Sequence, residues 1–216
     1  MGLEVRRPKV AVTRAAGQAD ELARRLEAMG CVPVVWPLIA VEPLGGEPLD
    51  PSPYDWVVVT SPNGAAELAR RLTAPPAHLA AIGSATADAL RSLGLRVDLV
   101  PAVSTQEGLL AELPPGRVLL AAAEGARRLL VDERDADLVA LYRTVELRPE
   151  TPPEGDLVLL ASGSAARAFA ATEASIPVVA IGPQTAAVAL GLGLDVVGVA
   201  ESHDVEGLLD VVRSLP

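Results

Sequence analysis

The 216-residue sequence predicts an α/β fold with parallel sheets, and three observations support this fold class. Short runs of Val, Leu and Ala alternate with segments in which apolar residues recur three and four positions apart, which is the period of a helix. The apolar runs are continuous, as in WVVVT at residues 56–60, and this is typical of parallel strands covered on both faces. One stretch of the chain recurs further along, which indicates two similar domains.

Ten apolar runs are expected to form strands. They are residues 9–14, 32–36, 56–60, 79–82, 97–100, 118–122, 138–142, 157–161, 178–181 and 196–199. The segments between them, such as residues 20–29 and 86–93, have helical periodicity. Strand and helix in alternation predict parallel sheets, and five strands for each of two domains is the size of a flavodoxin-like sheet.

The repeat relates residues 81–110 to residues 180–209 at a constant offset of 99, with 14 of 30 positions identical. Residues 55–65 (DWVVVTSPNGA) also match residues 156–166 (DLVLLASGSAA), at an offset of 101. Domains that are similar in sequence predict a cleft between them, and such clefts are preferred places for small-molecule sites.

Two stretches rich in Pro and Gly, residues 42–53 and 148–155, look like domain linkers. Counting strands between them places an outer domain at residues 1–37 and 147–216. An inserted domain then occupies residues 45–140, with crossovers near residues 37–44 and 141–147. We therefore expect two flavodoxin-like domains with parallel five-stranded sheets, the second inserted into the first, joined by a two-strand hinge and related by permutation.

Composition excludes several classes of partner. The net charge of −10 and the presence of only five aromatic residues disfavour nucleic acid and anionic membranes. No apolar run is long enough to span a bilayer and no signal-peptide pattern opens the chain, so we expect a cytoplasmic protein, and a monomer. The lone Cys31 excludes an internal disulfide and is expected to be a small buried hydrophobe.

Cofactor and metal signatures are also missing from the sequence. It contains neither G-x-x-x-x-G-K-[ST] nor G-x-G-x-x-G, so nucleotide binding by either glycine-rich loop is not expected. His78 and His203 stand alone, without the neighbours that a metal site requires. We therefore expect no metal and no cofactor.

Small and hydroxyl-bearing residues follow most of the predicted strands. Ligands of open parallel sheets bind at the carboxyl ends of the strands, where helix N-termini present unpaired N–H donors and partial positive charge. The candidate substrate-binding residues at these turns are Thr13, Arg14, Ser61, Asn63, Ser84, Thr86, Ser162, Gly163, Ser164, Gln184 and Thr185. Helix capping is the ordinary role of such residues, so several turns facing one cleft indicate a binding surface for anions but no particular ligand.

Tyr142 is a different kind of candidate. It ends a predicted strand in LYRTVEL, where the chain leaves the inserted domain, and its phenol can donate a proton or a hydrogen bond. The alternative is that the ring only packs at the hinge.

The chain resembles the uroporphyrinogen-III synthase family along essentially its full length, through weakly specific segments whose order and spacing together are specific. These segments are VAVTRA, VVWPLIAVEP, DWVVVTSPNGA, AIGSATADAL, VSTQEGLL, LYRTVEL, LLASGSAARAF, AIGPQTAAVAL and HDVEGLL. The resemblance implies two α/β domains joined by two strands. It also implies cofactor-independent closure of hydroxymethylbilane, a linear tetrapyrrole with eight carboxylates, to uroporphyrinogen III, with inversion of ring D and loss of water.

Residue by residue, Tyr142 matches the tyrosine thought to assist departure of the ring A hydroxyl. The positions that match the lining of the cleft are Ser61, Asn63, Thr86, Ser162 and Thr185, and Arg14 matches the basic position after the first strand. The chain departs from the family at Ala122, where Arg or Lys is usual, and at Gly163, where Pro is usual. Four arginines are candidates to offset the substrate's charge, namely Arg14, Arg127, Arg143 and Arg167.

Two other functions remain open from the residues alone. A non-catalytic two-domain binding or sensor module would keep the cleft but would need a partner domain. A sugar-phosphate enzyme using the same turns would need a base, for which Glu124 is the candidate.

Overall fold

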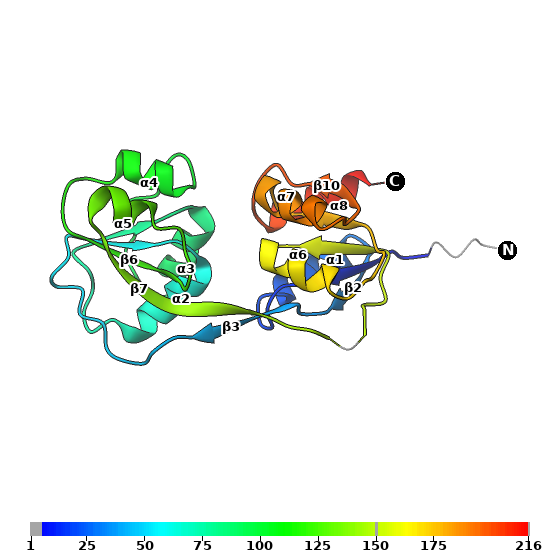
Figure 1. Ribbon diagram of the computed structural model, residues 1–216, viewed down its shortest axis with the longest axis horizontal. Helices are drawn as coiled ribbons and strands as arrows, with labels where there is room; N and C mark the ends of the chain where they lie inside the picture. Colours follow the sequence, from blue (N-terminus) through cyan, green and yellow to red (C-terminus); the bar gives the residue numbers. More distant parts are fainter. Residues whose placement is uncertain (1–5, 150, 216) are drawn as a thin grey trace. The chain divides into compact units, whose positions relative to one another are not determined.

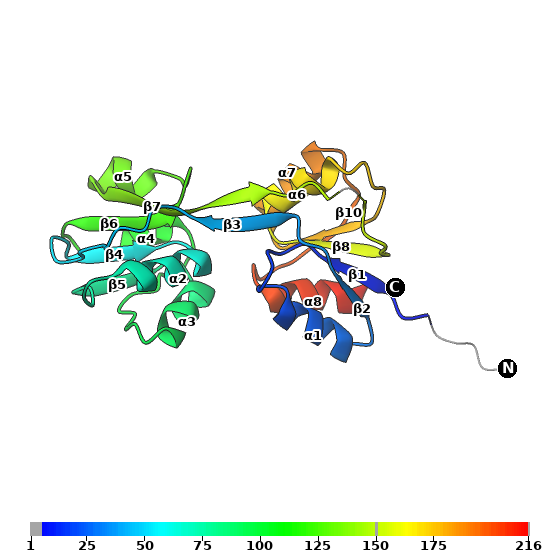
Figure 2. The same ribbon diagram turned by 90° about the horizontal axis from the view of Figure 1, so that it is seen from below.

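A computed structural model describes residues 6–149 and 151–215. The chain divides into two compact units. Unit 1 comprises Met1–Ala40 and Val145–Pro216, and unit 2 comprises Val41–Thr144. Each unit is a sheet with helices on both of its faces, as Figures 1 and 2 show for each unit separately.

Unit 1 is built on five parallel strands in the order β10-β9-β8-β1-β2. Its elements are β1 Lys9–Val12, α1 Asp20–Ala28, β2 Val32–Val35, β8 Leu157–Leu160, α6 Gly163–Ala170, β9 Val178–Ala180, α7 Pro183–Gly191, β10 Val196–Val199 and α8 Val205–Ser214. Alternate side chains of each strand face opposite sides of the sheet. Val10 and Val12 pack with α1 and α8, whereas Ala11 packs with α6 and α7.

Unit 2 has a second five-stranded sheet in the order β3-β7-β6-β4-β5, and its β4·β5, β4·β6 and β6·β7 pairings are parallel. Its elements are β3 Ile39–Pro43, β4 Trp56–Val59, α2 Pro62–Arg71, β5 His78–Ala81, α3 Ser84–Ser92, α4 Gln106–Glu112, β6 Val118–Ala123, α5 Leu129–Arg134 and β7 Asp137–Glu146. One core lies between the sheet and α2 and α3, and a second lies between the sheet and α4 and α5.

The pairing of β6 with β7 shifts register near the end of both strands. Ala122 pairs with Ala140, but Ala123 pairs with Tyr142, so Leu141 is an extra residue on β7. An extra residue interrupts the alternation of side chains between the two faces. Leu141 and Tyr142 consequently belong to the same core, the one shared with α2 and α3.

The predicted α/β fold with two parallel-dominated sheets of five strands is confirmed. One predicted strand is wrong. Residues 97–100 form no strand, because Leu99 makes only an isolated bridge with Ala80 and the Asp98 carboxylate accepts a hydrogen bond from the Leu79 N–H. The fifth strand of unit 2 is instead β3, part of which was assigned to a linker because it contains Glu42 and Pro43. Among the described residues, no helix is long and apolar enough to cross a membrane.

Candidate active site at the carboxyl ends of the strands

In unit 2, the candidate site contains a hydrogen bond between the hydroxyl groups of Ser61 and Tyr142. The Oγ atom of Ser61, directly after Thr60 at the end of β4, lies 2.7 Å from the Oη atom of Tyr142 on β7. The same Ser61 oxygen caps α2 by accepting a hydrogen bond from the Gly64 N–H at 3.0 Å. Tyr142 is only 5% exposed, and the register shift in β7 places its ring in the core beside α2.

Unit 1 repeats the serine cap. Ser162 follows Ala161 at the end of β8, and its Oγ accepts a hydrogen bond from the Ala165 N–H at 3.1 Å. Its backbone angles, φ −165° and ψ 160°, nearly equal the −163° and 155° of Ser61. The sequence match at an offset of 101 therefore corresponds to the same local structure in both units.

Two threonines occupy equivalent places in the first turns of α3 and α7. Thr86 is 3% exposed and Thr185 is 7% exposed. Neither hydroxyl has a hydrogen-bond partner within residues 6–149 and 151–215. Neither Oγ1 atom is among the fully buried, unpaired side-chain atoms of the described residues, so both hydroxyls reach the surface and are candidates to exchange hydrogen bonds with a ligand.

Thr13 has a different role from the one expected. Its side chain is fully buried, and its hydroxyl donates to the carbonyl oxygen of Leu159 at 2.7 Å. This bond links the end of β1 to β8. The hydroxyl is therefore not available to a ligand, and Thr13 stabilises the sheet on which the neighbouring site residues stand.

Arg14 carries a charge that Glu21 offsets only from beyond salt-bridge distance. Burial lowers the pKa of its guanidinium, and the charge of Glu21 opposes this shift. Arg14 forms no salt bridge with any residue that the structure describes. The other three candidate arginines are each paired with an exposed carboxylate; the pairs are Arg127–Glu107, Arg143–Glu42 and Arg167–Glu146.

The remaining candidates lie at the same strand ends. Ser84 and Gln184 are exposed in the first turns of α3 and α7, and Asn63 is half-buried in the first turn of α2. Ser164 accepts a hydrogen bond from Arg167 at 3.2 Å. Gly163 lies close to α7, since a Cβ there would be 3.3 Å from a methyl group of Val188.

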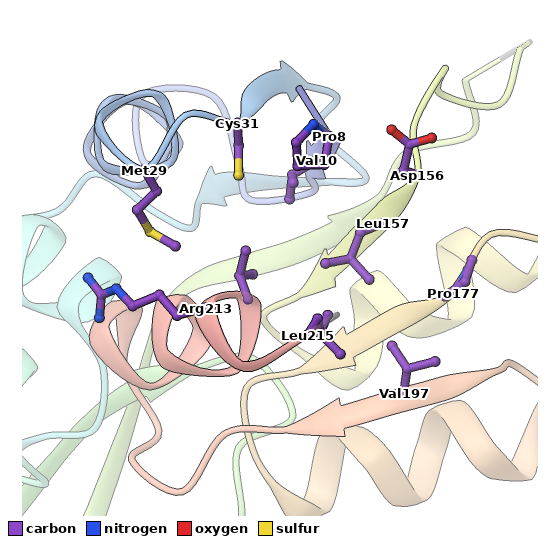
Figure 3. A pocket seen from close by; sticks show the side chains of 11 residues that line it. Pro8, Val10, Met29, Cys31, Asp156, Leu157, Pro177, Val197, Arg213 and Leu215 are labelled. Atoms are coloured by element: carbon purple, nitrogen blue, oxygen red, sulfur yellow. The ribbon is translucent and has the colours of Figure 1, made fainter. Parts of the chain in front are cut away.

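A mainly apolar cavity of about 750 Å³ lies at the opposite, amino-terminal edge of the unit 1 sheet. Pro8, Asp156 and Pro177, each directly before a strand or close to its start, line it, and Cys31 faces it (Figure 3). Burial raises the pKa of the Cys31 thiol, with Arg7 opposing the shift, so the thiol is held in its neutral form. The cavity is thus separate from the candidate site, and Cys31 is the small buried residue that was predicted.

No cluster of three His, Cys, Asp or Glu side chains that could hold a metal ion occurs in the described part of the chain. His78 is exposed and stacks on Trp56, with ring centroids 4.8 Å apart, and His203 is exposed. Glu124 is exposed as well. The described site residues are therefore hydroxyls, helix N-termini and one unpaired arginine, which suit binding of an anion and donation of a proton by a phenol.

The contact between Ser61 and Tyr142 was not predicted. The two residues are 81 positions apart, and their meeting depends on the register shift in β7. The sequence contains one weak indication of this contact. Ser61 follows one predicted strand and Tyr142 ends another, and the carboxyl ends of parallel strands in one sheet lie at the same edge.

Comparisons with a family profile, a curated protein and a solved structure all point to the same family. The profile of the family described as "Uroporphyrinogen-III synthase HemD" matches residues 20–210. The uroporphyrinogen-III synthase of Synechococcus elongatus is 29% identical over 118 residues, which cover 49% of this chain and 45% of that protein. The chain thus matches less than half the length of this relative.

A solved structure shows the same fold. The crystal structure of a mutant uroporphyrinogen III synthase from the extremely thermophilic bacterium Thermus thermophilus aligns with a TM-score of 0.59 over 95% of this chain and 97% of that chain, at 19% identity. Because the family profile covers well over half of its residues, the chain belongs to the uroporphyrinogen-III synthase family.

Proposed function

We propose that this protein closes hydroxymethylbilane to uroporphyrinogen III, with inversion of ring D and loss of water. The observation that carries the proposal is the Tyr142 phenol, held 2.7 Å from Ser61 at the carboxyl end of a parallel sheet, in a chain that belongs to this family. The hydroxyls of Thr86 and Thr185 support it, since neither has a hydrogen-bond partner among the described residues and each unit offers one to the substrate.

The proposed chemistry needs little acid–base strength from the protein. The ring A pyrrole nitrogen pushes electrons toward its hydroxymethyl carbon, the C–O bond breaks, and Tyr142 gives the departing oxygen a proton to form water. The substituted carbon of ring D then attacks the resulting cation to form a spirocyclic intermediate. Rearrangement of this intermediate and loss of one proton from ring D complete the macrocycle. The enzyme's main task is to hold the chain folded for that attack.

Charge complementarity in an acidic protein has to be local. The net charge of −10 repels a substrate with eight carboxylates, so binding depends on groups at the site. Within residues 6–149 and 151–215, Arg14 has no salt bridge to break before it meets a substrate carboxylate, unlike Arg127, Arg143 and Arg167. Helix N-termini at Ser61 and Ser162 add N–H donors.

We also propose the domain arrangement that such a reaction needs: two flavodoxin-like domains, the second inserted into the first, with the substrate in a cleft between them and the two connecting strands as the hinge. The strand order supports it. If the five strands of unit 1 are numbered 1 to 5 in chain order, their order across the sheet is 2-1-3-4-5. The strands of unit 2 have the same order across their sheet when β4, β5, β6, β7 and β3 are numbered 1 to 5. The two domains are then permuted relatives.

The proposed enzyme is a cofactor-independent lyase that acts in the cytoplasm as a monomer, with no nucleic acid and no membrane as partner. The test of the activity is to incubate purified protein with hydroxymethylbilane, oxidise the products and separate the porphyrin isomers. Isomer III in excess of isomer I is expected. Isomer I alone, which forms without enzyme, would exclude the proposal.

A further inference from the structure

We propose that Ser61 acts as a positioning residue for Tyr142, by donating its hydroxyl hydrogen to the phenol oxygen, and that this leaves the Tyr142 hydrogen free for the substrate. This inference rests on the proposed function, but its central test needs no substrate. It gives Ser61 a role different from the substrate contact that the family resemblance implies.

The first step of the argument is the geometry around Ser61. Its Oγ atom has two partners, the Gly64 N–H at 3.0 Å and the Tyr142 hydroxyl at 2.7 Å. A serine hydroxyl has one hydrogen to donate and two lone pairs that accept. Because the Gly64 N–H occupies one lone pair, the contact with Tyr142 uses either the hydrogen of Ser61 or its second lone pair.

The second step concerns direction, which the start of α2 decides. A phenol alone is the stronger donor of the two hydroxyls. However, the ten-residue helix α2 carries partial positive charge at its N-terminus, where Ser61 is the cap. A Tyr142 hydrogen aimed at Ser61 would point toward that charge. The chain Gly64 N–H to Ser61 Oγ–H to Tyr142 Oη instead runs away from it, and each bond in such a chain polarises and strengthens the next.

The third step is that Tyr142 has little freedom to turn elsewhere. Its side chain is 5% exposed, and the extra residue in β7 aims it at the α2 side of the sheet. Ser61 is its hydrogen-bond partner within the part of the chain that the structure describes. With its oxygen accepting from Ser61, Tyr142 presents its own hydrogen to a ligand.

The consequence for the reaction is a proton path that balances. The Tyr142 O–H bond breaks as its hydrogen moves to the departing ring A oxygen, and the electron pair stays on the phenol oxygen. The substrate C–O bond breaks with its pair on oxygen, which leaves as water. The Ser61 hydrogen stabilises the phenolate, and the proton later lost from ring D restores the phenol.

Three substitutions separate the possible roles. Ser61→Thr keeps both the cap and the donor. Ser61→Ala removes both. Ser61→Asp keeps a good helix cap, but a carboxylate has no hydrogen to donate, so Tyr142 must turn its hydrogen to Asp. Thr105→Ala is the matched control, because Thr105 caps α4 in the same unit through the Gly108 N–H at 3.1 Å, whereas the hydrogen bond of Tyr142 among the described residues is to Ser61.

The central measurement is the Raman Fermi doublet of tyrosine, whose intensity ratio rises when the phenol oxygen accepts a hydrogen bond and falls when the phenol donates one. The chain has two tyrosines, so the difference between a protein and its Tyr142→Phe counterpart isolates Tyr142. We expect an acceptor signature in the wild type, Ser61→Thr and Thr105→Ala, its loss in Ser61→Ala, and a donor signature in Ser61→Asp. A donor signature in the wild type, or an unchanged ratio in Ser61→Ala, would overturn the proposal.

Kinetics provide the second measurement. Ser61→Ala should lower kcat about five- to tenfold, the factor that one hydrogen bond of ordinary strength supplies, with KM unchanged. Ser61→Thr should restore kcat, and Thr105→Ala should leave both constants at wild-type values. A raised KM with unchanged kcat in Ser61→Ala would instead make Ser61 a substrate contact. If the wild type forms no isomer III, the proposed function fails, whereas the Raman ratio still decides the role of Ser61.

Discussion

Two glycines of the repeated E-G-L-L motif hold the same tight turn in both units, and replacing either should destabilise its own unit. Gly108 is the third residue of α4 and Gly207 the third residue of α8. A Cβ on Gly108 would lie 2.0 Å from the carbonyl oxygen of Val103, and one on Gly207 would lie 2.1 Å from that of Ser202. Gly108→Ala and Gly207→Ala are therefore the perturbations.

The magnitude follows from that distance. An ordinary contact between carbon and a carbonyl oxygen is about 3.3 Å, so each new methyl group overlaps its neighbour by more than about 1 Å. The neighbour is backbone and cannot swing away as a side chain can. Overpacking of this kind costs about 1–3 kcal/mol, and the better helix propensity of Ala returns up to about 1 kcal/mol. We expect the free energy of unfolding to fall by about 2 kcal/mol in each variant.

Urea denaturation measures this loss unit by unit, because Trp36 lies in unit 1 and Trp56 in unit 2. Removing one tryptophan leaves the fluorescence of the other to report its own unit. The matched control is Gly191→Ala at the last residue of α7, where a Cβ meets nothing within 4 Å, and which should be neutral or stabilising. If Gly108→Ala is as stable as Gly191→Ala, the steric explanation is refuted.

Three further predictions concern the site and the charges. Tyr142→Phe should lower kcat by roughly 10- to 100-fold without abolishing formation of isomer III, because orientation by the enzyme remains; unchanged turnover would remove Tyr142 from the mechanism. Arg14→Gln should raise KM roughly tenfold, whereas Arg24→Gln, the same loss of charge at an exposed position of α1, should leave KM unchanged; equal effects would contradict a specific contact. Hydrogen bonds from Tyr54 and Arg117 lower the pKa of Asp137 in the folded state, so the stabilisation is present above the carboxyl's ordinary pKa and is lost as the pH falls through the folded value. The urea midpoint of the wild type should therefore fall between about pH 5 and pH 3, and it should fall less in Asp137→Asn. The same fall in both proteins would contradict a contribution from Asp137.

Much of the fold could be predicted because its strands are buried on both faces. Continuous runs such as those of β4 and β8 are fully buried and stand out in the sequence. β3 was missed because none of its residues is fully buried and it contains Glu42 and Pro43. Residues 97–100 pair with β5 only through backbone hydrogen bonds of Asp98 and Leu99; the Leu79 N–H donates to the Asp98 side chain instead of extending the ladder, and no pattern in the sequence indicates that tertiary contact.

The candidate site was predicted in part, for similar reasons. The strand-end turns could be found, because hydroxyl residues that follow apolar runs mark the carboxyl edge of a sheet. The burial of Thr13 and its bond to Leu159, by contrast, depend on which strand lies beside β1. Likewise, the contact of Ser61 with Tyr142 depends on a single extra residue in β7, and no periodicity in the sequence indicates it.

The activity itself can be tested most directly by a time course of hydroxymethylbilane consumption at several protein concentrations, with the isomer composition measured in each sample. We expect the fraction of isomer III to rise with protein concentration until it replaces isomer I. Isomer I as the product at every concentration, with folded protein present throughout, would contradict the proposed function.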